Sequence, residues 1–337
     1  MLDWLLNIKS KTIKSRSLEN LMILFNNHIK PYLKNMEIYE VNLNVLQSLL
    51  KRIKGKEPRR KTKYLLNQFF DYAVVGRLVE YNPILSINIK DKEDEDVLKK
   101  EKEEFKAIKH EYREKFFTAL NNHEFLKSLC LTAYYSGLRI GELLGLRWQD
   151  IDFKEKTLSI EHAITFKVEY DEKGNKKSKE TILSSTKTKS SKTKLPMSNA
   201  LIMTLKEWEK HQKHSEIKKK IALTGNKNFV FCNEKGEMRT YYGTRKIFKE
   251  FLKNNNLQDC GIHFHAIRHT FGDVLRENNW SIYDIQKMLR HSKASTTEIY
   301  LSMEHNPALK LQKEIDDVFD KDINEKKDKK RNKDFEM

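Results

Sequence analysis

Four short segments of the chain together carry arginine, lysine, histidine and tyrosine side chains that could act on a phosphate. These are GLRIGE at 137–142, a lysine-rich stretch at 187–194, HAIRHT at 265–270, and LRHS at 289–292 followed by Tyr300. Taken singly, each has an ordinary structural explanation: a surface arginine after a helix end, a solvated edge strand, a salt-bridged or capping histidine, or a core tyrosine. Together, in this order in one chain, they are far more informative.

The combination suits cleavage of a phosphodiester by a tyrosine. Two arginines can bind the non-bridging oxygens of a phosphate in bidentate fashion, which lysine cannot do. Such contacts supply most of the electrostatic stabilisation in phosphoryl transfer. A tyrosine oxygen can attack the phosphorus and conserve the bond energy as a phosphotyrosine. A lysine can protonate the departing 5′ oxygen, and histidines can carry the remaining protons. This chemistry needs no cofactor, and the sequence offers no carboxylate cluster suited to two metal ions.

Three nearby histidines could be mistaken for a metal site. His265 and His269 would share one face of a helix, with His263 just before it. A third or fourth ligand at a convincing spacing is missing from the sequence, so zinc is not expected.

Composition favours a polyanionic partner. The formal net charge is +17, the sequence pI is about 9.4, and nucleic acid is the commonest partner for such a surplus. The alternative is a merely soluble basic protein. The three cysteines are far apart and form no CxxC, which argues against a disulfide framework and fits a reducing cytoplasm. No apolar run is long enough for a signal peptide or a membrane span.

The first 90 residues are expected to form a small helical bundle. Leu18, Leu21, Met22, Phe25 and Ile29 recur at the helical period, and Pro31 is expected to follow the last turn. A second helix would end at Gly55, and a third would run from about residue 61 to 79.

A basic stretch, KGKEPRRKTK at 54–63, precedes the third expected helix. Either it is a solvated loop, or its cations contact DNA phosphates as the duplex enters. We favour the second interpretation, which assigns DNA contacts to Arg59, Arg60, Lys61 and Lys63.

Residues 91–104 are nearly all charged and cannot build a core, so they are expected to link two domains. The second domain, 105–305, is expected to be helical with a small antiparallel β-sheet. Its expected strands lie at 157–166, 185–197 and 228–236, with a polar hairpin tip at 167–181. Its expected helices lie at 125–137 and near 243–255, 265–278, 282–290 and 296–303. A further short amphipathic helix is expected within 138–152. Residues 306–337 would be a C-terminal helix and charged tail.

At this point three stretches resemble the tyrosine recombinases, the integrases of phages and conjugative transposons. TAYYSGLRIGELLGLRWQDIDF at 132–153 is similar to the first arginine box of that family. HFHAIRHTFGDVL at 263–275 is similar to the second box, and MLRHSKASTTEIYLSM at 288–303 to the third. Residues 1–90 look like the helical core-binding domain that precedes them. The resemblance covers almost all of the chain to about residue 305, and it implies a mainly α fold with a small antiparallel sheet.

The resemblance implies a role for each matching residue. The catalytic set would be Arg139, Lys187, His265, Arg268, His291 and Tyr300, with Tyr300 as the nucleophile and Glu142 as a supporting acid. The long hairpin tip leaves Lys189 open as the alternative to Lys187, and Lys192 and Lys194 would anchor phosphates. The chain departs from the common second-box pattern at Ala266 and Ile267, which we interpret as packing variation.

The resemblance also implies partners. Two domains would close around double-stranded DNA as a C-shaped clamp, and four copies would assemble on two recombination sites to integrate or excise a mobile element. An excisionase and a host DNA-bending protein would be further partners, in the bacterial cytoplasm and with no membrane association. The chain begins almost at the core-binding helices, so an N-terminal arm-binding domain is expected to be missing. We expect the apolar face of 307–321 to dock on another subunit, or alternatively on its own domain.

Two rival functions remain. A type IB topoisomerase shares the tyrosine and the arginines, but a histidine nine residues before Tyr300 and the small N-terminal bundle favour a recombinase. A non-catalytic DNA-binding protein with the same fold would be indicated by loss of a catalytic residue, and the full set is present.

Overall fold

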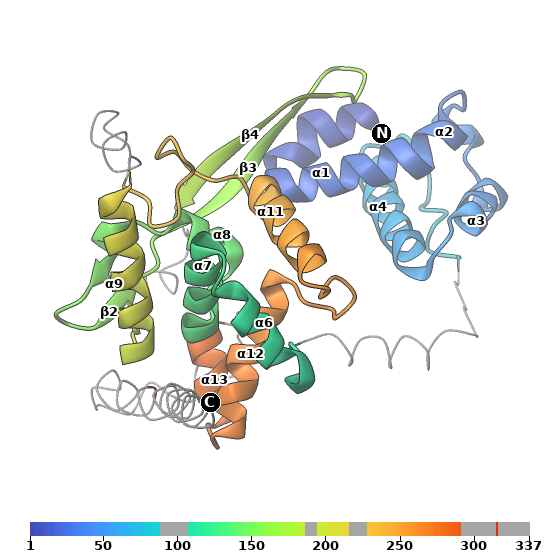
Figure 1. Cartoon of the computed structure of the whole chain (residues 1–337). Coiled ribbons are helices and arrows are strands. Elements are labelled where there is room, and N and C mark those ends of the chain that lie inside the picture. Colours follow the sequence, from blue (N-terminus) through green and yellow to red (C-terminus); the bar gives the residue numbers. More distant parts are fainter. Residues whose placement is uncertain (88–106, 186–193, 216–227, 291–314, 316–337) are drawn as a thin grey trace, which may run out of the picture. The chain divides into compact units, whose positions relative to one another are not determined.

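The computed structural model describes residues 1–87, 107–185, 194–215, 228–290 and Ile315 (Figure 1). The chain forms two compact units. The first comprises Met1–Lys99 with Phe166–Ile182, and the second Lys100–Thr165 with Leu183–Met337. The sequence led us to expect the whole hairpin in the second domain, whereas its distal part groups with the N-terminal helices.

Helices build the first unit around one apolar core. They are η1 (Trp4–Ile8), η2 (Lys9–Lys11), α1 (Ser15–Leu24), η3 (Phe25–Ile29), α2 (Lys30–Leu33), η4 (Ile38–Glu40), α3 (Leu43–Arg52) and α4 (Lys56–Val75). Asn42 caps α3 by accepting hydrogen bonds from the backbone N–H groups of Asn44 and Val45. Most of the apolar residues that the sequence placed on one helix face are buried, since Leu18, Met22, Phe25 and Ile29 all lie in this core.

Pro31 does not follow the first helix, as the sequence suggested. The helical path continues from α1 through the π-helical turn η3, and the proline lies at the start of α2. A proline is tolerated in the first turn of a helical segment because its missing N–H would be unpaired there in any case. The chain therefore stays helical across a residue that normally ends a helix.

The distal hairpin is held to the N-terminal helices by a buried carboxylate. Glu19, on α1, is 8% exposed and contacts the ammonium groups of Lys176 at 2.7 Å and Lys179 at 3.0 Å. Burial opposes ionisation of this carboxyl, but the hydrogen bonds from the two lysines outweigh it and lower the pKa of Glu19. Two hydrogen bonds to the hairpin turn add to this contact: Asn26 to the carbonyl of Gly174 at 3.1 Å, and Lys30 to that of Lys173 at 2.8 Å.

In the second unit, a helical core surrounds α7. The helices are α6 (His110–Leu120), α7 (Glu124–Ser136), α8 (Ile140–Gly145), η5 (Trp148–Asp150), α9 (Asn199–His214), α11 (Tyr241–Asn254), α12 (Phe264–Glu277) and α13 (Ile282–Leu289). Helix α7 is almost wholly buried and packs against both α9 and α12 (Figure 1). Because α7 leads directly into the first arginine box and α12 carries the second, this packing fixes the two boxes relative to each other.

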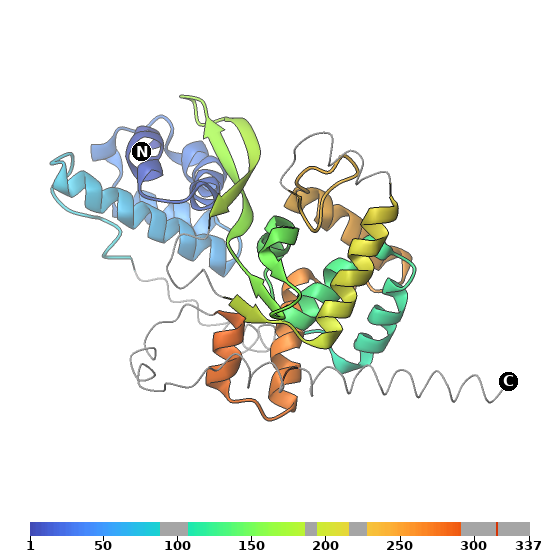
Figure 2. The same cartoon turned by 90° about the vertical axis from the view of Figure 1, so that its left-hand side faces the viewer.

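Two small antiparallel sheets accompany these helices. One has the order β1-β2-β5, with β1 (Ile151–Asp152), β2 (Thr157–Ser159) and β5 (Lys194–Pro196). The other is the long ribbon of β3 (His162–Tyr170) and β4 (Lys176–Ser185), seen in Figure 2. The single strand expected at 157–166 is therefore split between two sheets. The strand expected at 228–236 forms only isolated bridges, Phe229 with Arg147 and Cys232 with Met238.

The second unit also contains Ile315. Its side chain is 1% exposed and belongs to the core of this unit. The side chain at this position packs into the core of its own domain, which is the alternative interpretation given for this segment. None of the described helices is long and apolar enough to cross a membrane.

Gly137 ends α7 in the left-handed conformation, with φ of +62°, two residues before Arg139. A Cβ at this position would lie 2.7 Å from Cδ1 of Phe271, in α12. Glycine is therefore required both by the backbone conformation and by the close approach of the second-box helix.

We predict that Gly137→Ala destabilises the protein by about 2 kcal/mol, because the left-handed backbone and the contact with Phe271 both resist a methyl group. Thermal unfolding should show a midpoint lower by several degrees. The matched control is Gly76→Ala, at the end of α4, where φ is −76° and the nearest atom to an added Cβ lies 3.4 Å away. Equal effects of the two substitutions would contradict the explanation.

Candidate active site

The first and second boxes meet in the second unit at a cluster of arginines around one carboxylate. Arg139 precedes α8, and its backbone N–H donates to the Glu142 side chain, at Oε2, over 2.8 Å. Its guanidinium also contacts Glu142 Oε1 at 3.1 Å. Glu142, for which the sequence predicted a supporting role, thus contacts the arginine at both its backbone and its side chain.

Arg268 lies one turn into α12 and is almost fully buried, with 1% of its surface exposed. Its Nη1 donates to the carbonyl of Gly137 and its Nη2 to that of Leu289. The side chain therefore ties the end of α7 to the end of α13. Its Nε is buried and has no hydrogen-bond partner among the residues that the structure describes.

The electrostatics of the cluster are dominated by burial and by like charges. Burial lowers the pKa of Arg268 to about 9, and the charges of Arg139 and Arg290 add to this effect. Arg268 still carries its proton at neutral pH. Burial opposes ionisation of Glu142, yet the surrounding arginines lower the pKa of this carboxyl. The cluster is therefore cationic overall, as a site for a phosphate must be.

His265 lies beside these cations, three residues before Arg268. Burial lowers its pKa, and so do the nearby positive charges of Arg268, His263 and Arg139. At neutral pH the imidazole is therefore neutral and able to accept a proton. Its ring stands edge-on to that of His269, with ring centroids 4.5 Å apart.

The structure brings together only part of the expected site. The second unit contains Arg139, Glu142, His265 and Arg268. The two arginines and Glu142 form the cluster described above. Lys187, Lys189, Lys192, His291 and Tyr300 lie outside the described residues. Lys194 is exposed on β5, where it pairs with Ser159 of β2.

Arg290 also belongs to the arginine cluster, although it was not among the residues predicted from the sequence. It is the last described residue before His291, and its Nη2 lies 2.7 Å from Glu142 Oε2. The available signal was the position of an arginine inside LRHS, directly before the predicted third-box histidine.

The four basic residues expected to contact DNA have different surroundings. Arg60 and Lys61 are exposed and pair with Glu57 at 3.0 and 3.5 Å. Arg59 and Lys63 instead donate to the backbone carbonyls of Ile53 and Ile87 in their own unit. The first two are therefore better placed to reach a phosphate, whereas the last two also hold the unit together.

One group with metal-ligand spacing is found among the described residues, formed by Asp150, Glu161 and His162. A guanidinium already lies among them, because Arg147 Nη2 is 3.1 Å from Asp150, 3.6 Å from Glu161 and 2.9 Å from His162 Nδ1. This cation neutralises the group, and the arginine and Asp150 also form a helix cap.

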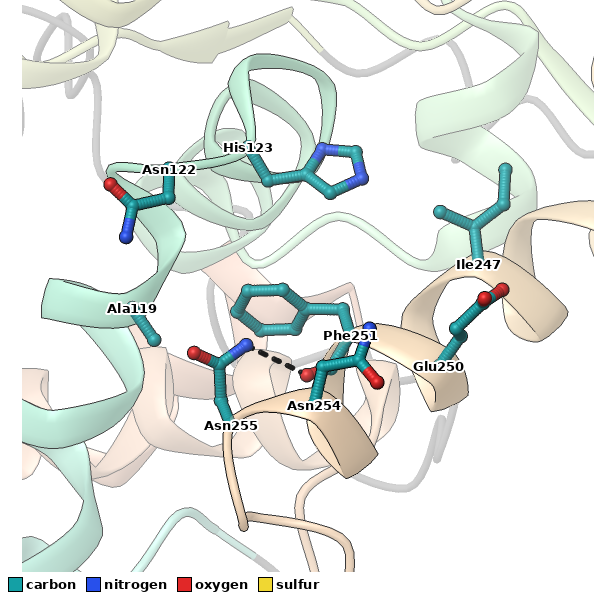
Figure 3. A pocket seen from close by; sticks show the side chains of 8 residues that line it. All are labelled: Ala119, Asn122, His123, Ile247, Glu250, Phe251, Asn254 and Asn255. Carbon is teal, nitrogen blue, oxygen red and sulfur yellow. Dashed lines mark hydrogen bonds between the residues drawn. The ribbon is translucent and has the colours of Figure 1, made fainter.

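A cavity of about 330 Å³ opens elsewhere on the second unit, between the α6–α7 turn and α11 (Figure 3). Its lining includes His123, Phe251 and three asparagines, Asn122, Asn254 and Asn255. Asn255 is engaged with the backbone, donating to the carbonyl of Phe251 at 2.9 Å. None of the expected site residues lines this cavity, so it is separate from the arginine cluster.

Comparison with known proteins establishes the family. Residues 106–306 match the phage integrase family, and residues 1–53 match the phage integrase N-terminal SAM-like domain. The chain is 32% identical over 292 residues to the tyrosine recombinase XerC-like protein of Caldanaerobacter subterraneus subsp. tengcongensis, covering 82% of this chain and 72% of that protein.

Solved structures show the same fold. The Tn1549 transposon integrase in complex with transposon right end DNA has a TM-score of 0.65 at 20% identity, covering 90% of this chain and 94% of that one. A lambda integrase dimer bound to a COC′ core site has a TM-score of 0.54 at 17% identity, covering 87% of this chain and 90% of that one. The expected mainly α fold with small antiparallel sheets is thereby confirmed.

The chain belongs to the phage integrase family of tyrosine recombinases, enzymes that cleave and rejoin DNA. The resemblance seen in the three sequence boxes is therefore confirmed.

Proposed function

We propose that this enzyme integrates or excises a mobile element by site-specific recombination, through a 3′-phosphotyrosyl intermediate on Tyr300. The observation that carries the proposal is the meeting of Arg139 and Arg268 around Glu142, with the neutral imidazole of His265 close by. Two fixed guanidinium groups are suited to the non-bridging oxygens of one phosphodiester.

In the proposed reaction, the Tyr300 oxygen attacks the scissile phosphorus and the bond from phosphorus to the 5′ oxygen breaks. His265 or His291 accepts the phenol proton, and Lys187 or Lys189 donates a proton to the leaving 5′ oxygen. Arg139 and Arg268 stabilise the charge that builds on the non-bridging oxygens. The 5′ hydroxyl of a partner strand then reverses these steps, which rejoins DNA without an external energy source.

We further propose the partners. Double-stranded DNA is the substrate, supported by the DNA-bound structures of the Tn1549 and lambda integrases. Assembly as a homotetramer on two sites is supported by the lambda integrase tetramer bound to a Holliday junction. The same proposal includes two further partners, an excisionase and a host DNA-bending protein, and a cytoplasmic location. It also divides the chain into a core-binding domain at 1–90, a linker at 91–104, a catalytic domain at 105–305 and a C-terminal segment at 306–337.

The proposal predicts a covalent protein–DNA adduct on a suicide substrate, in which a nick beside the scissile phosphate lets the cleaved end diffuse away. Denaturing electrophoresis should show the adduct with EDTA present, because the expected groups are cationic side chains rather than metal-bound water. Partial stimulation by Mg²⁺ would be compatible, since the ion also helps DNA to compact. Formation of the adduct only when Mg²⁺ is restored would contradict the mechanism.

A further inference from the structure

Arg290 holds the carboxylate of the cluster from its buried side. Its Nη2 lies 2.7 Å from Glu142 Oε2, while Arg139 Nη1 lies 3.1 Å from Oε1 of the same group. The side chains of Arg290 and Glu142 are 10% and 11% exposed, whereas that of Arg139 is 43% exposed. The carboxylate is therefore shared between an inner arginine and an outer one.

The backbone at Arg290 is tied to the same cluster. Arg139 Nη2 donates to the Arg290 carbonyl at 3.3 Å, and Arg268 Nη2 donates to the carbonyl of Leu289 just before it. Both arginines expected to bind the phosphate thus contact the end of α13. The chain continues from there directly into His291.

Two features of Arg290 oppose folding. Arg290 ends α13 in the left-handed conformation, with φ of 51° and ψ of 49°, where glycine is the residue without strain. Its Nη1 is buried and has no hydrogen-bond partner among the described residues. A buried, unpaired donor and a strained backbone both oppose folding. The contact that offsets these costs is the ion pair with Glu142.

The balance of charge around Glu142 indicates what Arg290 does there. Among the described residues, Arg139, Arg268 and Arg290 surround the one carboxylate of Glu142. Without Arg290, the full charge of Glu142 would act on Arg139, drawing this outer guanidinium inwards and cancelling part of its field. With Arg290 present, the carboxylate is already neutralised from inside. Arg139 is then free to bind an anion whose charge increases in the transition state.

We propose that Arg290 is a positioning residue of the cleavage site, which neutralises Glu142 and so leaves Arg139 available to the scissile phosphate. This inference rests on the proposed function, in which Arg139 and Arg268 bind that phosphate. Arg290 acts through Glu142 and is not itself assigned to the DNA.

The test is Arg290→Gly, which removes the guanidinium and relieves the strained backbone. With protein in excess over a suicide substrate, the single-turnover cleavage rate should fall about 10- to 100-fold, the size expected for a displaced catalytic group. DNA affinity should change less than about threefold, because the many surface lysines supply most of it. A cooperative thermal unfolding transition shows that the variant is folded.

The discriminating readout is a double-mutant cycle with Glu142→Gln. If Arg290 serves to offset the carboxylate, adding Arg290→Gly to Glu142→Gln should slow cleavage by less than about threefold further. A full 10- to 100-fold loss in that background would overturn the proposal, and so would wild-type cleavage by Arg290→Gly alone. Failure of the wild-type protein to form any adduct would instead count against the proposed function.

Discussion

Replacing Arg268 with lysine is expected to lower the rate of DNA cleavage by about 10³-fold while DNA binding changes little. The magnitude is that of losing a transition-state donor or an arginine finger. The guanidinium has five N–H donors in a fixed plane, so three remain after it donates one each to the carbonyls of Gly137 and Leu289. A lysine ammonium keeps the charge but cannot make these contacts together.

The measurement is single-turnover cleavage at saturating protein, beside a gel-shift titration of the same DNA. Arg276→Lys is the matched control, because Arg276 lies on the same helix but is 69% exposed and pairs with Asp273 at 3.4 Å. Its cleavage rate should equal that of the wild type. Loss of DNA affinity by Arg268→Lys in proportion to loss of cleavage would contradict a role in the transition state.

Replacing Tyr300 with phenylalanine is expected to abolish adduct formation altogether. The substitution removes one oxygen, which the proposed mechanism uses as the nucleophile, and leaves the ring for packing. The variant should bind its DNA site with wild-type affinity. Tyr283→Phe, a substitution at a 54% exposed tyrosine on α13, should leave adduct formation unchanged. Any adduct formed by Tyr300→Phe would exclude Tyr300 as the sole nucleophile.

The sequence predicted much of the site because its chemistry is local. Arg139 and Glu142 lie in one helix cap, and Arg268 lies one turn into a helix whose position follows from apolar periodicity. Arg290 was missed although it lies inside LRHS, because its own stretch of sequence does not contain the carboxylate that it contacts. Its partner, Glu142, lies 148 residues earlier in the chain, and only the fold brings the two together.

The same limit explains the differences in the fold. Glu19 and Lys176 are 157 residues apart, so periodicity could not predict that the distal hairpin packs with the N-terminal helices. Pro31 was expected to follow a helix because the prediction did not allow for a π-helical turn. Ile315 carries an apolar side chain that suits a subunit interface and a domain core equally well, and composition alone could not decide between them.

Peptide mapping of the trapped adduct tests most directly whether Tyr300 forms the covalent bond to DNA. After trypsin and nuclease treatment, the nucleotide should remain on the peptide of residues 294–310, which contains Tyr300 and no other tyrosine. Fragmentation of this peptide in a mass spectrometer should place the phosphate on the tyrosine. A nucleotide found on the peptide of residues 277–287, which contains Tyr283, or on any serine would contradict the account.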